Sequence, residues 1–344
     1  MGQHNYTFYG LNKYAYIAYK FSVKPDDEEG FPLKPKVYID GKEGTTGLQI
    51  YERLSARGDI DLLLIDEKKR KDTAERKKLL NAADLVFLCL PDKAAMEAVD
   101  LIENPATRVV DASTAHRVAP GWVYGFPELG AEQKNAIIHA GRVANPGCHA
   151  TGFLSIAAPL VKLGILPVNY PMTVYSLTGY SGGGKKMIAQ YEEDARDTEY
   201  DAPRIYGLNL RHKHLPEMQK IAGLEFPPVF NPVVDDYYKG MATTLMLHNR
   251  LLNGRPTAEN IAQALAGFYA GQSLVSVVPF GGQEPMLSAN KLAGKDTLEI
   301  TVCGHEDQTM VTARFDNLGK GASGAAVQNM NLMLGFEETT GLNF

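Results

Sequence analysis

The chain has 344 residues, of which 44% are hydrophobic, which is enough to build two domains with sizeable cores. A formal net charge of −5, with no long basic block, argues against nucleic acid or an anionic membrane surface as a partner. The three cysteines, Cys89, Cys148 and Cys303, lie far apart without metal-ligand spacing, so we expect reduced thiols, a cytoplasmic protein and no metal site.

Residues 1–33 are an N-terminal extension to which we assign no role. They are rich in Tyr and Lys, and they lack the apolar centre and small-residue cleavage site of a signal peptide. Further along, Lys162 and Pro167 interrupt the best candidate for a membrane-spanning stretch. We therefore expect no membrane association.

Residues 34–147 are predicted to form a dinucleotide-binding domain. A buried strand at Val37–Ile39 runs into a glycine-rich turn and then an amphipathic helix that continues to Leu54. Glycines here let the backbone approach a pyrophosphate at the helix N-terminus, although the first gap between them is one residue longer than in the common fingerprint. The candidate cofactor-binding residues are Gly41, Gly44, Thr45, Thr46 and Gly47.

Three further strand-like runs follow, at Ile60–Ile65, Asp84–Leu90 and Arg108–Asp111, with helical stretches between them. This alternation is typical of βαβ units. We therefore predict an α/β fold whose first domain is a Rossmann-like, doubly wound parallel sheet that binds its ligand at the carboxyl ends of the strands.

The residues after the second strand leave the choice of cofactor open. Asp66 is placed to accept the ribose 2′-hydroxyl of NAD, whereas Lys68, Lys69 and Arg70 are placed to hold the 2′-phosphate of NADP. A solvent-exposed helix start with ordinary charges would give the same pattern.

Arg117 follows the fourth strand on a loop at the carboxyl edge of the sheet. An arginine there can bind a phosphate or carboxylate through paired hydrogen bonds. It can equally tie the loop to Glu128 as a structural ion pair.

Cys148 lies between a Pro-Gly turn and a long apolar segment, Phe153–Leu163, and so at the start of a helix. Unpaired amides and the helix dipole stabilise negative charge at that position, so we expect the pKa of Cys148 to fall toward neutrality and the thiolate to act as a nucleophile. The alternative is an ordinary buried cysteine, as Cys89 and Cys303 are expected to be.

Residues 148–316 are predicted to form a second, α+β domain. A strand at Met172–Leu177 leads into a second glycine-rich turn, in which Ser181, Gly182 and Gly183 can bind an anion or border a nicotinamide amide. A helix is expected at Thr257–Ala270. The remaining strands, forming a largely antiparallel sheet, are expected at Ala242–Asn249, Leu274–Val278, Leu298–Cys303 and Thr309–Phe315.

The motif Arg211-His-Lys-His-Leu-Pro-Glu217 carries two histidines on one face of an extended segment. No third ligand for a metal lies near them, so His212 and His214 are candidates for acid–base work, with His212 preferred for proton delivery. Residues 317–344 begin with a glycine-rich turn and continue as a helix, which we expect to return to the first domain and to place Asn329 near the cofactor.

These motifs together resemble the N-acetyl-gamma-glutamyl-phosphate reductase family of arginine biosynthesis, in its shorter branch and with the fold of the semialdehyde dehydrogenases. The resemblance runs from about Lys36 to the C-terminus, and His149 stands where that family usually has Tyr. The residues that carry it are Asp111–Trp122, Asn145-Pro-Gly-Cys-His-Ala-Thr-Gly152, Ser181-Gly-Gly-Gly184, His212–Glu217 and Asp316–Asn331.

The resemblance implies that Cys148 attacks N-acetyl-L-glutamyl 5-phosphate to form a thioester, which NADPH then reduces to the semialdehyde. It also implies a homodimer or homotetramer. Arg117 and Arg211 are the candidates for binding the substrate's phosphate or carboxylate, and Glu217 is a further candidate substrate-binding residue.

Two other interpretations remain open at this level. An aspartate-semialdehyde dehydrogenase would share the architecture and the Cys/His pair but differ in the substrate pocket. A catalytically silent dinucleotide sensor would keep the first glycine-rich turn and would not need Cys148 or the histidines.

Overall fold

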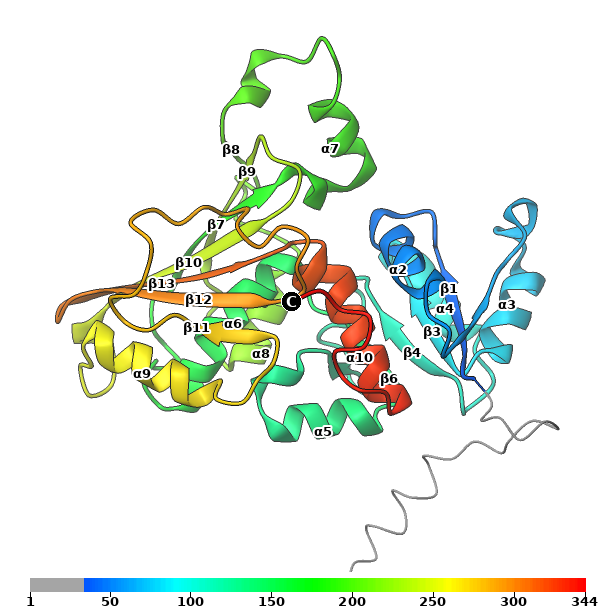
Figure 1. Ribbon diagram of the computed structural model, residues 1–344, viewed down its shortest axis with the longest axis horizontal. Helices are drawn as coiled ribbons and strands as arrows, with labels where there is room; N and C mark the ends of the chain where they lie inside the picture. Colours follow the sequence, from blue (N-terminus) through cyan, green and yellow to red (C-terminus); the bar gives the residue numbers. More distant parts are fainter. Residues whose placement is uncertain (1–33) are drawn as a thin grey trace, which may run out of the picture.

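The computed structural model describes residues 34–344, and the N-terminal extension at 1–33 lies outside the described residues. Two sheets lie beside each other, and the C-terminal helix α10 (Gly324–Leu334) lies between them (Figure 1). The first sheet has the strand order β2-β1-β3-β4-β6-β5, and the second has the order β11-β12-β13-β10-β7-β9-β8.

The first sheet is parallel throughout, which confirms the predicted Rossmann-like fold. Its strands are β1 (Lys36–Asp40), β2 (Asp61–Leu63), β3 (Leu85–Leu88), β4 (Arg108–Asp111), β5 (Val123–Tyr124) and β6 (Arg142–Ala144). Its helices are α2 (Thr45–Ser55), α3 (Thr73–Ala82), α4 (Asp92–Asp100) and α5 (Ala131–His139).

Both faces of this sheet are covered, as parallel sheets require. Alternate residues of β1 point to opposite faces: Val37 and Ile39 pack in a core with α2, α5 and α10, whereas Tyr38 packs in a core with α3 and α4. The buried strands therefore read as continuous apolar runs in the sequence.

The second sheet is largely antiparallel, with parallel pairs only at β11–β12 and β7–β9 among its described neighbours. Its strands are β7 (Thr173–Gly179), β8 (Arg204–Ile205), β9 (Val229–Asp235), β10 (Met241–His248), β11 (Val275–Val277), β12 (Leu298–Gly304) and β13 (Gln308–Phe315). The sequence did not predict β8, which has only two residues, or β9, whose interior Pro232 argues against a strand.

Helix α6 (Cys148–Lys162) is the centre of the second core. It is buried on nearly every side against the sheet and against α8 (Leu215–Ala222) and α9 (Ala258–Phe268). Pro159 lies inside the helix and has no amide to donate to the carbonyl of Ser155. The hydroxyl of Tyr269 donates to that carbonyl instead, at 2.7 Å.

The remaining elements are short. Helix α7 (Gly184–Tyr191) and β8 belong to a lobe at the top of Figure 1. The 3₁₀ helices are η1 (Glu67–Lys69), η2 (Pro127–Leu129), η3 (Tyr180–Gly183), η4 (Thr198–Asp201) and η5 (Asn249–Leu251), and a π-helical turn, η6 (Gly319–Ser323), precedes α10.

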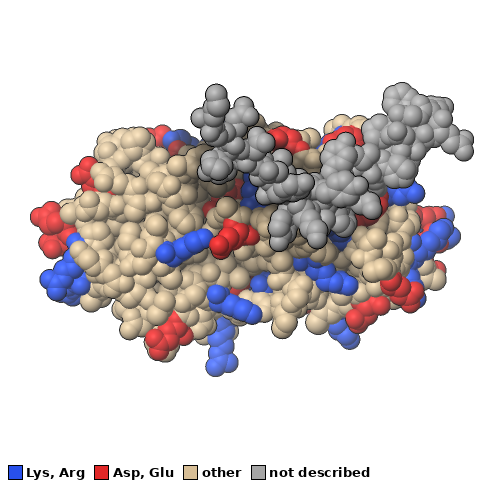
Figure 2. All heavy atoms as spheres, turned by 90° about the horizontal axis from the view of Figure 1, so that it is seen from below, with Lys and Arg blue, Asp and Glu red and all other residues tan. Residues whose placement is uncertain are grey.

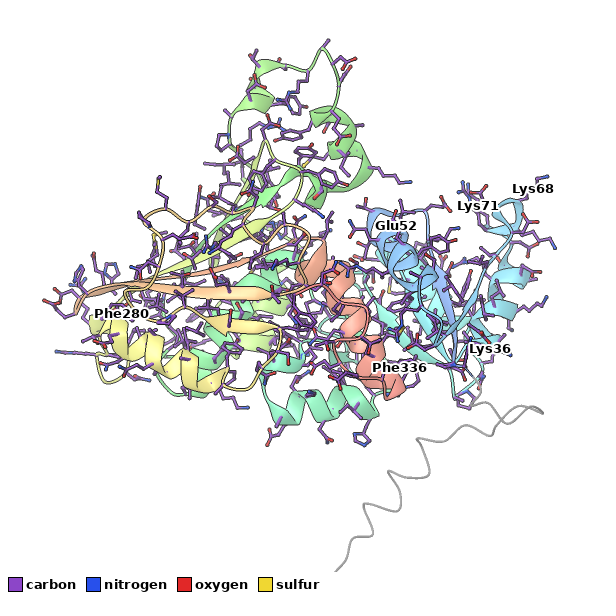
Figure 3. All side chains as sticks on the ribbon, in the orientation of Figure 1. Lys36, Glu52, Lys68, Lys71, Phe280 and Phe336 are labelled. Atoms are coloured by element: carbon purple, nitrogen blue, oxygen red, sulfur yellow. The ribbon has the colours of Figure 1, made fainter. Side chains whose placement is uncertain are left out.

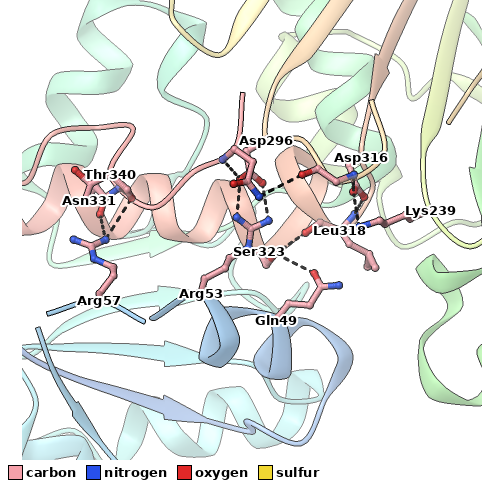
Figure 4. Close-up of polar contacts among 12 residues, drawn as sticks. Gln49, Arg53, Arg57, Lys239, Asp296, Asp316, Leu318, Ser323, Asn331 and Thr340 are labelled. Atoms are coloured by element: carbon pink, nitrogen blue, oxygen red, sulfur yellow. Dashed lines mark hydrogen bonds and ion pairs between the residues drawn. The ribbon is translucent and has the colours of Figure 1, made fainter. Parts of the chain in front are cut away.

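The C-terminal segment packs against the first domain. Ala326, Val327 and Met330 of α10 share the core that contains Val37 and Ile39. Polar contacts join the same parts (Figure 4): Arg57, two residues after the end of α2, donates to Asn331 Oδ1 at 2.6 Å, and the hydroxyl of Ser323 donates to Gln49 Oε1 at 3.0 Å.

The distribution of charged side chains on the surface is consistent with the modest net charge. On the face shown in Figure 2, acidic and basic side chains are interspersed over the described residues. Within residues 34–344, no helix is long and apolar enough to cross a membrane.

Candidate active site

A cavity of about 470 Å³ collects most of the predicted site residues. The residues around it come from the first glycine-rich turn, the Arg117 loop, the start of α6, the second glycine-rich turn, the His212–His214 segment and the turn before α10. The predicted residues that line it are Gly44, Thr45, Thr46, Gly47, Arg117, Cys148, Ser181, Gly182, Gly183, His212 and His214.

The turn before Cys148 is closely packed. A Cβ on Gly147 would lie 2.4 Å from Arg117 Nη1 and 2.5 Å from His214 Nε2, so any other residue there would displace these two side chains. The amide of Gly147 donates to Glu217 Oε2 at 3.1 Å. Glu217 therefore fixes the backbone that carries the cysteine into the first turn of α6.

Arg117 and Glu217 form a buried ion pair, with 2.6 Å between Nη1 and Oε1. The hydroxyl of Tyr124 donates to the other carboxylate oxygen, also at 2.6 Å. Arg117 therefore pairs with Glu217 rather than with Glu128, the partner that the sequence suggested. The carboxylate of Glu128 binds Lys320 instead, at 2.6 Å.

The predicted fall in the pKa of Cys148 is not observed. Burial raises the pKa of the thiol, and this outweighs the favourable charges of Arg117 and Lys213 and the hydrogen bond from the amide of His149. The helix start contributes as expected, but the cost of desolvating a thiolate is larger. The resting group is therefore a thiol that needs a base.

Both predicted histidines are neutral near pH 7. Burial and the charges of Lys213 and Arg117 lower the pKa of His212 to about 4, and burial and Arg117 hold the pKa of His214 well below its usual 6.5. The rings lie edge to face, with 4.7 Å between their centroids.

Hydrogen bonding distinguishes the two rings. The main-chain amide of His214 donates to Nδ1 of His212 at 3.2 Å, so the neutral ring of His212 carries its proton on Nε2. Nδ1 of His214 is buried and has no hydrogen-bond partner among the described residues.

The first glycine-rich turn has the close backbone contacts that an anion-binding turn needs. Gly41 has φ +89°, and a Cβ there would lie 2.4 Å from the carbonyl oxygen of Cys89. A Cβ on Gly47 would lie 2.4 Å from the carbonyl oxygen of Gly41. Gly44 is the N-cap of α2, so the first-turn amides of Thr45 and Thr46 have no intrahelical acceptor.

A second cavity of about 410 Å³ lies on the other side of this turn, and Leu90 lines both cavities. Gly41 lines this second cavity, as do Arg70 and Lys71. Figure 3 shows Lys68 and Lys71 near the outer end of the first domain, by the segment that joins β2 to α3.

The side chain of Asp66 is held by a local hydrogen bond. Its carboxylate accepts the amide of Lys68 at 2.9 Å and caps η1, and it does not line the second cavity. Lys68 and Lys69 do not line it either. Of the charged residues singled out in the sequence, only Arg70 lines this cavity.

The second glycine-rich turn is held by the C-terminal segment. Asn317 lines the first cavity. Its side-chain Nδ2 donates to Ser181 Oγ at 3.0 Å, and its side-chain Oδ1 accepts a hydrogen bond from the amide of Gly240 at 2.8 Å. These bonds leave the turn of Gly182 and Gly183 facing the cavity.

Four predicted site residues do not line the first cavity. Gly41 lines only the second cavity. The side chain of Arg211 is exposed beyond its rim. Glu217 lies behind the cysteine turn. Asn329 is fully buried and donates to Asn145 Oδ1 at 3.2 Å, so it supports a cavity residue from behind.

Sequence reasoning did not single out Asn145, Tyr206 or Lys213 as site residues, although all three line the cavity. Asn145 and Lys213 belong to the motifs that contain Cys148 and the two histidines. Their position beside these residues could therefore have identified them as site residues. Tyr206 follows the undetected strand β8, and no local pattern marks it.

Comparison with known proteins agrees with this architecture. Residues 64–137 match the family described as "Semialdehyde dehydrogenase, NAD binding domain", and residues 148–317 match "Semialdehyde dehydrogenase, dimerisation domain". Aspartate semialdehyde dehydrogenase II from Vibrio cholerae has a similar fold, with a TM-score of 0.67 at 16% identity over 88% of this chain and 98% of that one. The first domain therefore binds a nicotinamide dinucleotide.

Two relatives are more similar in sequence. "N-acetyl-gamma-glutamyl-phosphate reductase 2" of Nostoc sp. is 47% identical over 90% of this chain and 99% of its own length. "N-acetyl-gamma-glutamyl-phosphate reductase" of Sinorhizobium medicae is 49% identical over 88% of this chain and 99% of its own length. This chain therefore belongs to the N-acetyl-gamma-glutamyl-phosphate reductase family.

Proposed function

We propose that the protein reduces N-acetyl-L-glutamyl 5-phosphate to N-acetyl-L-glutamate 5-semialdehyde and phosphate, with NADPH, in arginine biosynthesis. The observation that carries the proposal is the single cavity in which Cys148, Arg117 and two neutral histidines lie beside the dinucleotide turn. The family membership supports the same reaction.

Anion binding at the cavity is assigned to Arg117 and Lys213. Three donors of Arg117 are engaged, by Asn145, Glu217 and Ala112, out of the five that a guanidinium has. Its remaining N–H groups and the ammonium of Lys213 are available to the acyl phosphate. The exposed Arg211 is left as an outer contact for the substrate's carboxylate.

The first chemical step begins from a neutral thiol and neutral imidazoles. We assign the thiol proton to His214, because its Nε2 lies against the turn that carries the cysteine, 2.5 Å from where a Cβ on Gly147 would be. Cys148 sulfur attacks the acyl carbon as the proton leaves. The bond from carbon to the phosphate oxygen breaks, and phosphate departs with the electron pair and takes a proton from solvent. A thioester remains on Cys148.

When bound, the reduced nicotinamide supplies the hydride that reduces this thioester. His212 donates a hydrogen bond from Nε2 to the oxygen on which charge develops, and protonated His214 returns its proton to that oxygen. As the carbonyl re-forms, the carbon–sulfur bond breaks, and His214 transfers the hydroxyl proton back to sulfur. This division reverses the preference for His212 that the sequence suggested.

The preference for NADPH is assigned to Arg70 and Lys71, because both line the second cavity and Asp66 does not. The glycine-rich turn fits a pyrophosphate, since a Cβ on Gly41 or Gly47 would fill the space that the backbone needs. The residues that would hold the cofactor are those of this turn, Arg70, Lys71 and the second glycine-rich turn.

The deciding experiment is a phosphate-dependent, NADP-linked oxidation assay with N-acetyl-L-glutamate 5-semialdehyde, run beside the same assay with aspartate 4-semialdehyde. We expect turnover with the N-acetylated aldehyde. Preference for the aspartate aldehyde would favour the aspartate-semialdehyde dehydrogenase alternative, which shares this fold. Binding of NADPH without turnover of either aldehyde would favour a dinucleotide sensor.

The assembly and the location of the protein follow as further proposals. The match to a dimerisation domain over residues 148–317 supports oligomerisation through the second domain, and we propose a homodimer or homotetramer. We also propose a cytoplasmic location, as expected from the cysteine content.

A further inference from the structure

His149, the residue after the nucleophile, is the centre of a chain of side-chain hydrogen bonds. Its ring is 2% exposed. Nδ1 lies 2.8 Å from Ser176 Oγ, and Nε2 lies 2.7 Å from the hydroxyl oxygen of Tyr206. Ser176 Oγ lies in turn 2.8 Å from Thr243 Oγ1. Four side chains from α6, β7, β10 and the segment after β8 are therefore connected.

The buried end of this chain determines the direction of its hydrogen bonds. Thr243 and Ser176 are fully buried, and the hydroxyl of Thr243 has no other hydrogen-bond partner among the described residues. If Thr243 were only an acceptor, its own proton would be left unpaired in the core, which is unfavourable because a buried donor without a partner loses its hydrogen bond to water and gains none in return. Thr243 therefore donates to Ser176, and Ser176 donates to Nδ1 of His149.

It follows that His149 carries its proton on Nε2 and donates it to the oxygen of Tyr206. The hydroxyl proton of Tyr206 then has no acceptor within the chain of hydrogen bonds, and Tyr206 lines the same cavity as Cys148. The hydroxyl protons of Thr243 and Ser176 and the Nε2 proton of His149 each have an acceptor. The hydroxyl proton of Tyr206 is therefore available to a substrate in this cavity.

The surroundings keep these groups in the required protonation states. Burial and the neighbouring His212 lower the pKa of His149 to about 3, so the ring is neutral and has one donor and one acceptor. Burial, with the nearby Cys148, raises the pKa of Tyr206, so its hydroxyl stays protonated. Phe230 packs against the His149 ring at 5.0 Å between centroids and limits its rotation.

We propose that Tyr206 is a substrate-binding residue whose hydroxyl donates a hydrogen bond to an oxygen of the acyl substrate at Cys148, and that His149, Ser176 and Thr243 are positioning residues that orient this hydroxyl. The identity of the substrate rests on the proposed function. The direction of the hydrogen bonds does not depend on the identity of the substrate.

The direction is tested without any turnover, by ¹⁵N NMR of histidine-labelled protein at pH 7. The His149 signals are identified by their loss in His149→Gln. We expect a protonated Nε2 and an unprotonated Nδ1. The opposite tautomer would turn the Tyr206 proton inward, toward the ring, and would overturn the inference even in an inactive protein.

The substrate contact is tested by kinetics. Tyr206→Phe removes only the hydroxyl and should lower kcat/KM about tenfold, as expected for one hydrogen bond. Tyr200→Phe, in the lobe outside both cavities, is the matched control and should leave kcat/KM unchanged. An active wild-type protein with an unaffected Tyr206→Phe variant overturns the inference, whereas an inactive wild type overturns the proposed function instead.

A double-mutant cycle tests whether His149 acts through Tyr206. His149→Ala should lower kcat/KM severalfold in the wild type and have no further effect in Tyr206→Phe. Ser176→Ala breaks the chain one bond further from the cavity with little change in volume, and it should behave in the same way if His149→Ala folds poorly. His149→Gln, which can both donate and accept, should restore part of the loss. Additive losses in the cycle would contradict a positioning role.

Discussion

At the scale of single residues, Cys148 is the residue on which the proposed chemistry depends. Cys148→Ala should abolish turnover, because no thioester can form, while the affinity for NADPH stays nearly unchanged. Cys303→Ala on β12 is the matched control and should keep full activity with a small loss of stability. Steady-state turnover together with NADPH titration by fluorescence checks both, and residual activity in Cys148→Ala would refute the mechanism.

The two histidines should respond differently to the same substitution. His214→Asn removes the proton acceptor and should lower kcat by about 10²–10⁴. His212→Asn keeps a side-chain N–H donor, so its loss should be smaller than that of His212→Ala.

The pH profile of kcat/KM checks this assignment. Because the neutral imidazole is the base, activity should fall as the pH drops through the depressed pKa of His214, so the acid limb should lie well below pH 6.5. His212→Asn should retain that limb. Loss of the limb in His212→Asn and its retention in His214→Asn would restore the assignment suggested by the sequence.

The residues of the second cavity should determine cofactor preference. Arg70→Ala should reduce the margin between NADP and NAD about tenfold, which corresponds to about 1.4 kcal/mol. Lys68→Ala, whose side chain does not line the cavity, is the control and should leave both dissociation constants unchanged. A preference for NAD in the wild type would contradict the assignment of Arg70 and Lys71.

At the scale of one element, α6 combines a nucleophile at its first residue with a proline inside it. Tyr269→Phe should leave the buried carbonyl of Ser155 without a donor and destabilise the protein by about 1–3 kcal/mol. Tyr238→Phe, at an exposed position, should stay within about 0.5 kcal/mol of the wild type. Urea denaturation measures both, and equal stabilities would mean that water replaces the Tyr269 hydroxyl.

At the scale of the whole molecule, a buried ion pair joins the two domains (Figure 4). Arg53 of α2 donates to both oxygens of Asp296, at 2.6 and 2.8 Å, and Asp296 is fully buried. Arg53→Ala should cost about 3–5 kcal/mol, because it leaves a buried carboxylate without its counter-charge, held only by the amide of Asn343 among the described residues. Lys77→Ala, which breaks an exposed pair with Glu103, should cost less than about 1 kcal/mol.

Calorimetric melting of the two variants checks this prediction. Because Arg53 is on the helix that starts at the dinucleotide turn, Arg53→Ala should also weaken NADPH binding, whereas Lys77→Ala should not. An Arg53→Ala variant that melts like the wild type would show that this ion pair does not stabilise the contact between the domains.

The sequence by itself was sufficient for features that depend on local patterns. The strand and helix of the first turn follow from the apolar run at Val37–Ile39 and the spacing of its glycines. The position of Cys148 at a helix start follows from Pro146, Gly147 and the apolar segment after them. These patterns arise from steric and hydrogen-bonding requirements within a few residues, so they can be read from the chain directly.

The tertiary structure alone decided which groups meet and what their protonation states are. Arg117 pairs with Glu217, a hundred residues away, and not with Glu128. The pKa of the Cys148 thiol is higher than its position at a helix start suggests. Tyr206 lies at the cavity and is hydrogen-bonded to His149. Desolvation and long-range pairing depend on everything packed around a group, and no segment of the sequence contains that information.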